Sequence, residues 1–281
     1  MIDVIKAIIL GVIEGITEWL PVSSTGHLIL ANEFLKMNVS AEFMEMFEVV
    51  IQLGAIIAVV AIFWNKLWPF STRNSVSVQP LIGKVGIKRR SLDLWIKVII
   101  ACLPAAVIGI LFDDQIDALF FNPTTVAITL IVYGIAFIVI ERINKNKEFK
   151  VHTVKGISYK TAVFIGLFQV LSMIPGTSRS GATIIGAMLL GLSRTAAAEF
   201  SFFLAVPVMF GASLLKLVKF GFAFTGAEFI ILAAGMIISF VVSIIIIKFL
   251  LEYIRKKSFS VFGYYRILLG VIVLLYFFVI K

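Results

Sequence analysis

Several stretches of this sequence are long, apolar and almost free of charge, and this feature restricts the chain to a membrane fold. Two of them cover residues 49–64 and 229–251. A helix needs about 20 mostly apolar residues to cross a bilayer. Hydrophobic residues make up 60% of the 281 residues and charged residues only 15%, whereas a soluble domain carries about a quarter of charged residues. We therefore predict an all-α integral membrane protein that crosses the bilayer several times.

Hydropathy predicts six transmembrane helices and two further apolar stretches that are broken in the middle. The six helices are expected at residues 44–64, 92–112, 123–141, 199–218, 228–251 and 264–280. The broken stretches, near residues 2–35 and 158–190, are interrupted by "LPVSSTG" and "IPGTSRSG". Their arms of about a dozen residues are too short to span a bilayer. We predict that both are re-entrant helical hairpins whose polar tips line a cavity inside the membrane.

The basic residues are concentrated in three of the predicted loops. They lie in the basic loop 65–91, in the loop after the third helix and in the loop after the fifth. The loop after the second helix, "DDQID" at 113–117, has no Lys or Arg. With six spans and two hairpins, all three basic loops fall on one side, which the positive-inside rule makes cytoplasmic. We thus expect external N- and C-termini, and the net charge of +9 needs no nucleic-acid partner to explain it.

The two broken stretches also match each other weakly, without gaps, at an offset of 155 residues. In this alignment "LGVIEGITEWLPVSSTG" faces "IGLFQVLSMIPGTSRSG". The identical pairs are Gly11 with Gly166, Ser23 with Ser178 and Gly26 with Gly181. Each match opens a half of one hairpin and three spans, which divides a single membrane domain into repeats at 1–141 and 158–281. An odd number of spans separates the hairpins, so the repeats are inverted and the two tips should meet near the bilayer midplane.

The first tip, "EGITEWLPVSSTGH", contains two carboxylates, a run of hydroxyls and an imidazole. Glu14 and Glu18 share one helical face, and such hard oxygen ligands suit Mg²⁺ or Ca²⁺; the alternative is that they bond structurally to the other tip. Ser24 is a candidate nucleophile, or alternatively a helix cap, and His27 lies three residues further on as a candidate base or a structural hydrogen-bonding group. The other hydroxyls are weaker candidates for the site and are also candidate caps: Ser23 and Thr25.

The second tip, "PGTSRSGAT", contains Arg179 among glycines and hydroxyl residues. A guanidinium, hydroxyl donors and the free N–H groups of a helix start together make a site for phosphate oxygens. The alternative is that Arg179 pairs only with Glu14 or Glu18. The other candidate phosphate-binding residues are Gly176, Ser178, Ser180 and Thr183. Weaker candidates for supporting the cavity lie on the predicted spans: Glu48, Gln52 and Glu199.

Carboxylates, a hydroxyl, an imidazole and an anion site at facing tips favour phosphoryl transfer on an amphiphilic substrate. A flippase or transporter for a lipid phosphate is the alternative from a different class, because inverted repeats with facing broken helices also form transporters. A transporter needs the anion site, but it has less use for a neighbouring nucleophile and base. A non-catalytic scaffold is disfavoured by the concentration of polar residues at both tips.

The motifs "LGVIEGITEWLPVSSTGHL" and "PGTSRSGAT" resemble the two signature motifs of the undecaprenyl-diphosphate phosphatase family, of the bacitracin-resistance type. "FEVVIQLGAIIAV" and "EFSFFLAVPVMFGAS" resemble further blocks of that family, so the likeness covers nearly the whole chain. The resemblance implies hydrolysis of undecaprenyl diphosphate to undecaprenyl phosphate and phosphate, which recycles the lipid carrier of peptidoglycan synthesis. It also implies that the protein confers bacitracin resistance and depends on a divalent cation. It further implies that the protein lies in the bacterial cell membrane, with its active site open to the outer face.

The resemblance also assigns the site residue by residue. The family's motif positions fall on Glu14, Glu18, Ser24, His27, Ser178, Arg179 and Thr183. We favour Ser24 as the nucleophile with His27 as its base, and the alternative is that His27 itself attacks and forms a phosphohistidine. The expected partners are the polyprenyl diphosphate substrate and membrane lipids, and homo-oligomer formation stays open.

Overall fold

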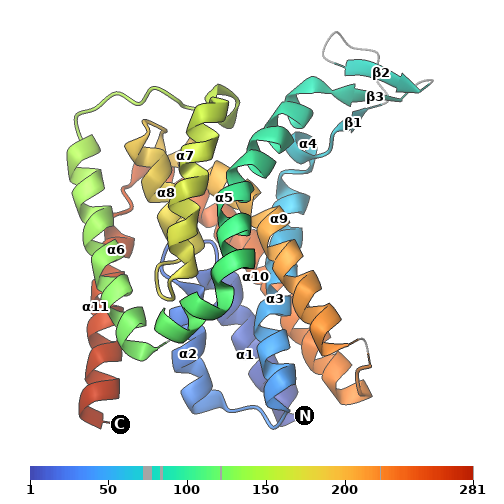
Figure 1. Ribbon diagram of the computed structural model, residues 1–281, viewed down its shortest axis with the longest axis vertical. Helices are drawn as coiled ribbons and strands as arrows, with labels where there is room; N and C mark the ends of the chain where they lie inside the picture. Colours follow the sequence, from blue (N-terminus) through green and yellow to red (C-terminus); the bar gives the residue numbers. More distant parts are fainter. Residues whose placement is uncertain (72–77, 83–84, 121, 222, 281) are drawn as a thin grey trace.

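The computed structural model describes residues 1–71, 78–82, 85–120, 122–221 and 223–280. This described part is almost entirely helical (Figure 1). The first half contains α1 (Ile2–Thr17), α2 (Ser24–Leu35), α3 (Ala41–Ile62), α4 (Trp64–Leu67), α5 (Arg89–Phe120) and α6 (Pro123–Asn144). The second half contains α7 (Tyr159–Val170), α8 (Arg179–Leu189), α9 (Arg194–Phe220), α10 (Gly226–Lys256) and α11 (Ser260–Leu275). Three short helical turns complete it: η1 (Val154–Gly156), η2 (Leu171–Met173) and η3 (Tyr276–Ile280).

Among the described residues, six helices are long and apolar enough to cross a membrane. They are Ala41–Ile62, Arg89–Phe112, Pro123–Asn144, Arg194–Phe220, Gly226–Lys256 and Ser260–Phe278. Each predicted span overlaps one of these helices. The predicted all-α, multi-pass membrane fold is therefore confirmed.

The predicted loop "DDQID" at 113–117 is wrong, because α5 continues through it to Phe120. Figure 1 shows the last turns of α5 bending towards α6 at the bottom of the molecule. Asn122 is extended (φ −145°, ψ 155°) and caps α6 by accepting the Thr125 N–H. Pro123 follows directly, and a proline disfavours helical backbone in the residue before it. The proline, and not the acidic residues, ends the helical path.

The predicted basic loop 65–91 is not a plain loop. After α4 it contains β1 (Phe70–Ser71), β2 (Val78–Ile82) and β3 (Val85–Lys88), which form a small antiparallel sheet in the order β1-β3-β2. In its register, Phe70 and Gln79 both face Ile87 on the central strand. The β-branched residues of "VSVQPLIGKVGIK" favour this strand structure. The sheet projects from one end of the molecule, at the upper right of Figure 1.

Both broken stretches form pairs of short helices joined by a turn. In Figure 1, α1 and α2 lie in the lower half of the molecule, α7 and α8 lie in the upper half, and both joining turns point towards the middle. The helical hairpins are therefore present as pairs of helices. That they enter and leave the bilayer through one face stays a prediction, because helix geometry alone does not locate the membrane surface.

The contacts between helices follow the pattern that an inverted repeat produces. Helix α1 packs on α10, and its counterpart α7 packs on α5. Helix α3 packs on α9, and α6 packs on α11. When each helix is replaced by its counterpart in the other half, the α1–α10 contact becomes the α7–α5 contact. The α3–α9 and α6–α11 contacts each become themselves. This pattern supports the inverted repeat, while the limits 1–141 and 158–281 stay predictions.

Two glycines that align in the repeat lie at equivalent helix contacts. A Cβ on Gly11 in α1 would meet the backbone oxygen of Gly235 in α10 at 2.6 Å. A Cβ on Gly166 in α7 would collide in the same way with the backbone oxygen of Ala101 in α5. Small residues let membrane helices approach backbone to backbone. The aligned glycines thus allow the α1–α10 and α7–α5 contacts that fix each hairpin to a span.

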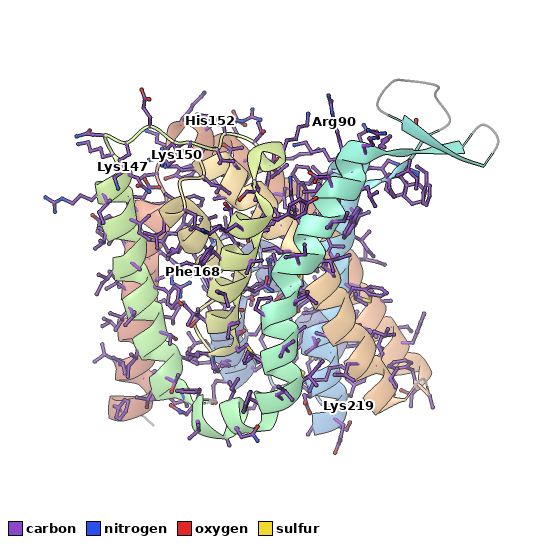
Figure 2. All side chains as sticks on the ribbon, turned by 45° about the horizontal axis from the view of Figure 1, so that its top comes forward. Arg90, Lys147, Lys150, His152, Phe168 and Lys219 are labelled. Atoms are coloured by element: carbon purple, nitrogen blue, oxygen red, sulfur yellow. The ribbon has the colours of Figure 1, made fainter. Side chains whose placement is uncertain are left out.

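Most of the basic side chains labelled in Figure 2 lie at one end of the molecule. Figure 2 shows Arg90, Lys147, Lys150 and His152 at this end, and Lys219 at the opposite end. Both chain termini lie at the end opposite to the basic residues (Figure 1). The positive-inside rule predicts that the basic end is cytoplasmic.

A pair of exposed lysines provides a test of this orientation. In a Cys102→Ser background, a membrane-impermeant thiol reagent applied to intact cells should label Lys219→Cys and leave Lys147→Cys unlabelled until lysis. Both positions are exposed, so a difference in labelling reports the side of the membrane. The opposite labelling pattern would reverse the predicted orientation.

Candidate active site

The two hairpin tips share an unusual backbone conformation at one aligned position. Ser23 (φ 74°) and Ser178 (φ 71°) are the non-glycine residues with positive φ in the described part of the chain. Each serine caps the helix that follows: Ser23 Oγ accepts the Gly26 N–H at 3.3 Å, and Ser178 Oγ accepts the Gly181 N–H at 3.2 Å. Strained backbone of this kind costs about 1–3 kcal/mol and is concentrated at functional sites. Both tips are therefore held in a costly conformation that the sequence repeat preserves.

One carboxylate joins the two tips. The hydroxyl of Ser24 donates to Oε2 of Glu18 at 2.9 Å, and Nη2 of Arg179 donates to Oε1 of the same group at 3.1 Å. The side chains of Glu18 and Arg179 are 8% and 10% exposed, so water screens this ion pair little. Ser180 adds a bond from its hydroxyl to the Glu18 backbone oxygen at 3.3 Å. The predicted nucleophile and the predicted anion-binding arginine are thus brought to one group.

Arg179 is held from its other side by α9. Its Nη1 donates to the backbone oxygen of Ser201 at 2.6 Å. Thr183 donates to the Arg179 backbone oxygen at 2.8 Å, and its oxygen lies 2.8 Å from the Ser201 hydroxyl. Nε of Arg179 is buried and has no hydrogen-bond partner among the described residues. This guanidinium is fixed in place and still has its Nε–H to offer as a donor.

His27 is bonded to groups other than Ser24. Its Nδ1 lies 2.7 Å from the Ser23 backbone oxygen, so Nδ1 carries the proton and donates to that oxygen. Its Nε2 lies 2.6 Å from the hydroxyl of Tyr265, and the two rings stack with centroids 5.6 Å apart. The group bonded to the Ser24 hydroxyl is Glu18. The predicted role of His27 as the base for Ser24 stays a prediction.

Glu14 is the second carboxylate of the first tip, and it is fully buried. Neither of its oxygens has a hydrogen-bond partner among the described residues. A buried carboxylate without a partner costs several kcal/mol unless it is protonated or binds a cation. The described residues gather no group of three or more His, Cys, Asp or Glu side chains that could hold a metal by themselves. Any cation here would need further ligands besides such side chains, such as backbone, hydroxyl, water or substrate oxygens.

Some of the remaining predicted site residues lie at the tips, and others lie away from them. Gly176 (φ 86°) packs so closely on α6 that a Cβ would meet the Val126 backbone oxygen at 2.6 Å. Glu48 accepts a bond from Asn32, and Glu199 pairs with Lys66 at 2.8 Å and not with the tips. Thr25 is exposed and Gln52 is partly exposed.

Arg266 was not among the predicted site residues, and it ties the two tips together from α11. This arginine is completely buried. It donates to the backbone oxygens of Pro21 (3.1 Å), Gly176 (2.7 Å) and Thr177 (3.0 Å), one from the first tip and two from the second. A single arginine within an apolar span was the available signal, because such a charge usually marks a functional position. Ser201 and Tyr265 were missed as well, and no sequence spacing relates them to the tips.

An apolar cavity of about 440 Å³ adjoins the first tip. Its polar lining residues are Thr17, His27 and Tyr265, and the rest are aliphatic or aromatic. The apolar lining residues come from α1, from the turn that follows it and from α11: Ile13, Ile16, Leu20, Val22, Val261 and Phe262. The site therefore combines a polar centre at the two tips with an adjacent space for an apolar group.

Residues 7–272 match the model of the family described as bacitracin resistance protein BacA. This match covers nearly the whole chain and includes both tips. The chain belongs to this family. Among its relatives, the protein named undecaprenyl-diphosphatase from Acetivibrio thermocellus is 61% identical over 281 residues, which is 100% of both chains. Proteins of the same name from Desulfitobacterium hafniense (59% identical, 99% of this chain and 97% of the relative) and Enterococcus faecalis (58%, 98% and 97%) are similarly close to this BacA-family chain.

Proposed function

We propose that this protein hydrolyses undecaprenyl diphosphate to undecaprenyl phosphate and phosphate. The observation that carries the proposal is the Glu18 carboxylate, which bonds the Ser24 hydroxyl through one oxygen and Arg179 through the other. A nucleophile, its base and an anion-binding group are the parts that phosphoryl transfer requires. The relatives named above are phosphatases by name, and none of those names is that of a transporter.

In the proposed reaction the Ser24 oxygen attacks the terminal phosphorus of the diphosphate. The bond from that phosphorus to the bridging oxygen breaks, and undecaprenyl phosphate leaves. Glu18, which is bonded to the Ser24 hydroxyl, takes the base role in place of His27, the base favoured from the sequence. It accepts the hydroxyl proton and passes it to the leaving group, which balances the first step. A water molecule then attacks the phosphoserine, Glu18 takes a proton from this water and returns it to the Ser24 oxygen, and phosphate is released.

Arg179 binds and orients the phosphate oxygens in both steps. Its bonds to Ser201 and Glu18 fix the guanidinium plane, and the unpartnered Nε provides a donor for an incoming oxygen. Because these donors are preorganised, little reorganisation is needed as charge moves to the phosphate oxygens. His27 and Tyr265 close the side of the site next to the apolar cavity, which would take the first isoprene units of the lipid.

A divalent cation, Mg²⁺ or Ca²⁺, fits this set of residues. Glu14 presents two buried oxygens without a partner, and Glu18 lies one helical turn further on. Mg²⁺ is usually held by one or two carboxylates together with substrate phosphate oxygens, so the small number of protein ligands agrees with this type of site. Glu14 and Glu18 would hold the cation, which when bound supplies charge neutralisation for the diphosphate.

The proposal also includes where the protein acts. The termini and the labelled basic residues lie at opposite ends (Figures 1 and 2), which supports external termini under the positive-inside rule. The hairpin of α1 and α2 lies in the same half as the termini (Figure 1), and we infer that the site opens from this side to the outer face of the bacterial cell membrane. In this position the protein would recycle the lipid carrier for peptidoglycan synthesis, and removal of undecaprenyl diphosphate would lower the sensitivity of the cell to bacitracin.

The direct test is phosphate release from purified protein given undecaprenyl diphosphate, with and without a chelator. We expect release of one phosphate per lipid and its loss on chelation. Glu18→Gln, which cannot accept the proton, serves as the inactive control. Absence of phosphate release under all conditions, together with protein-dependent movement of the lipid between vesicle leaflets, would favour a transporter instead.

Replacing the Glu14 carboxylate is predicted to change the cation requirement of the activity. Glu14→Gln should raise the Mg²⁺ or Ca²⁺ concentration needed for half-maximal activity by about tenfold or more, since a charged oxygen ligand is lost. The shift of the thermal unfolding temperature with added cation should weaken in parallel. Glu45→Gln, which neutralises an exposed carboxylate on α3, is the matched control. An unchanged cation requirement in Glu14→Gln would make its role structural.

A further inference from the structure

A second cavity, of about 680 Å³, lies at the basic end of the molecule, away from the hairpin tips. It is formed where β3 and the first turn of α5 meet the segment before α7 and the start of α9. Arg90 and His152, both labelled at this end in Figure 2, belong to its lining. The proposed phosphatase reaction uses no residue of this cavity.

The acidic residues of the cavity are already paired. Glu199 accepts a bond from Lys66 at 2.8 Å. Asp93 accepts one bond from Lys97 at 2.6 Å and another from the Tyr159 hydroxyl at 2.6 Å. Both carboxylates are therefore neutralised by neighbouring groups, and neither is left to balance a further cation.

Three basic side chains of the lining have no acidic partner. Lys88, Arg90 and Lys155 form no ion pair within the described part of the chain. The sequence shows that residues 65–91 contain no Asp or Glu at any position, so the segment beside Lys88 and Arg90 carries no acid either. The cavity consequently has an excess of positive charge that an anion would neutralise.

Neutral donors accompany these cations. Ser91, in the first turn of α5, and Thr195, in the first turn of α9, both line the cavity. The free N–H groups and the positive dipole end of a helix start favour anions, phosphate in particular. A concave surface with guanidinium, ammonium and hydroxyl donors is well suited to the several oxygens of a phosphate group.

The neighbouring aromatic residues locate this cavity relative to the lipids. Trp64 and Trp68 stack with ring centroids 4.5 Å apart, are 46% and 42% exposed, and lie on and directly after α4. Exposed tryptophans of this kind gather at the level of the lipid headgroups. The cavity thus lies at the height of lipid phosphates on the end that the charge distribution predicts to be cytoplasmic.

We propose that this cavity binds a phosphate-bearing anion, supplied either by the headgroup of an anionic membrane lipid or by free phosphate. The proposal goes beyond the phosphatase reaction and does not depend on it. A general excess of positive charge on the cytoplasmic side would explain basic residues at this end. It would not require three unpaired cations on the lining of one cavity.

The test compares two variants that each lose two positive charges from the same end. Arg90→Gln with Lys155→Gln removes cations from the cavity, whereas Arg142→Gln with Lys147→Gln removes exposed cations that do not line it. Bound ³²P-phosphate is measured by equilibrium dialysis of the purified full-length protein in detergent. Retained phosphatidylglycerol, against phosphatidylcholine, is measured by native mass spectrometry after extraction from mixed vesicles.

We expect the cavity variant to lose about tenfold or more in affinity for phosphate, for phosphatidylglycerol or for both, and the surface variant to match the unchanged protein. Loss of phosphate binding alone identifies free phosphate as the ligand, and loss of lipid retention alone identifies the headgroup. Both variants should keep the thermal unfolding temperature and the gel-filtration profile of the unchanged protein, which shows that they fold. Equal losses in the two variants, or no loss in the cavity variant, would overturn the proposal.

Discussion

Ser24→Ala is expected to lower the turnover number at least about 10⁴-fold while leaving diphosphate binding nearly intact. Removing a nucleophile from a catalytic unit typically costs this much or more. The Arg179 side chain that would bind the diphosphate belongs to the opposite tip and keeps its bond to Ser201. The measurements are turnover with undecaprenyl diphosphate and, separately, binding of the diphosphate to the variant.

Thr25→Ala is the matched control for this substitution. It removes a neighbouring hydroxyl from the same first turn of α2, and Thr25 is exposed. Its activity should stay close to that of the unchanged protein. A comparable loss in both variants would mean that the Ser24 hydroxyl acts by stabilising the helix start and not by attack.

His27 is the competing candidate for the nucleophile. Attack by Ser24 and attack by His27 lead to trapped intermediates of different chemical stability. If Ser24 attacks, rapid quenching with labelled substrate should trap a phosphoserine, which survives acid. If His27 attacks, the adduct should be acid-labile and should disappear in His27→Ala. The structure gives His27 bonds to the Ser23 backbone and to Tyr265, so we expect His27→Ala to slow turnover through misplacement of the first tip. An acid-labile adduct would contradict the Ser24 assignment.

The membrane fold could be predicted from sequence because hydropathy directly reports burial in lipid. All six predicted spans overlap apolar helices of the structure. The acidic stretch 113–117 misled the prediction, since charge suggested a loop while the backbone stays helical to Phe120. The sheet at 70–88 was missed because its strands are short and its basic residues dominated the pattern.

Some of the residues that meet at the two tips could be predicted from the sequence, but their pairing could not. The repeat alignment located both tips, and Ser23 and Ser178 even share the same positive φ. Which carboxylate bonds Ser24 depends on how the turn at 18–23 folds back, and spacing along the chain does not determine this. Arg266 is 245 positions from Pro21 and 90 positions from Gly176 in the sequence. No local sequence pattern connects residues that are so far apart.

Arg179→Lys is expected to lower kcat/KM by about 10²–10³-fold although the charge is kept. Arg179 uses Nη1 for Ser201 and Nη2 for Glu18, and it has Nε left for a phosphate oxygen. A lysine ammonium is a compact point charge and cannot bond in these three fixed directions at once. Loss of one preorganised donor to a developing oxyanion costs roughly 2.7–4 kcal/mol, which corresponds to the expected range.

The matched control is Arg194→Lys, which changes another arginine of an ion pair outside the tips. Arg194 donates through Nε and Nη2 to Glu141 at 2.8 and 2.5 Å. This substitution should lower the thermal unfolding temperature and leave kcat/KM nearly unchanged. The hydrogen bonds of its side chain in the described residues go to Glu141 and not to either tip. Arg179→Lys should do the reverse. Near-normal turnover in Arg179→Lys would show that positive charge alone is sufficient there, and the fixed guanidinium geometry would then have no part in binding the phosphate.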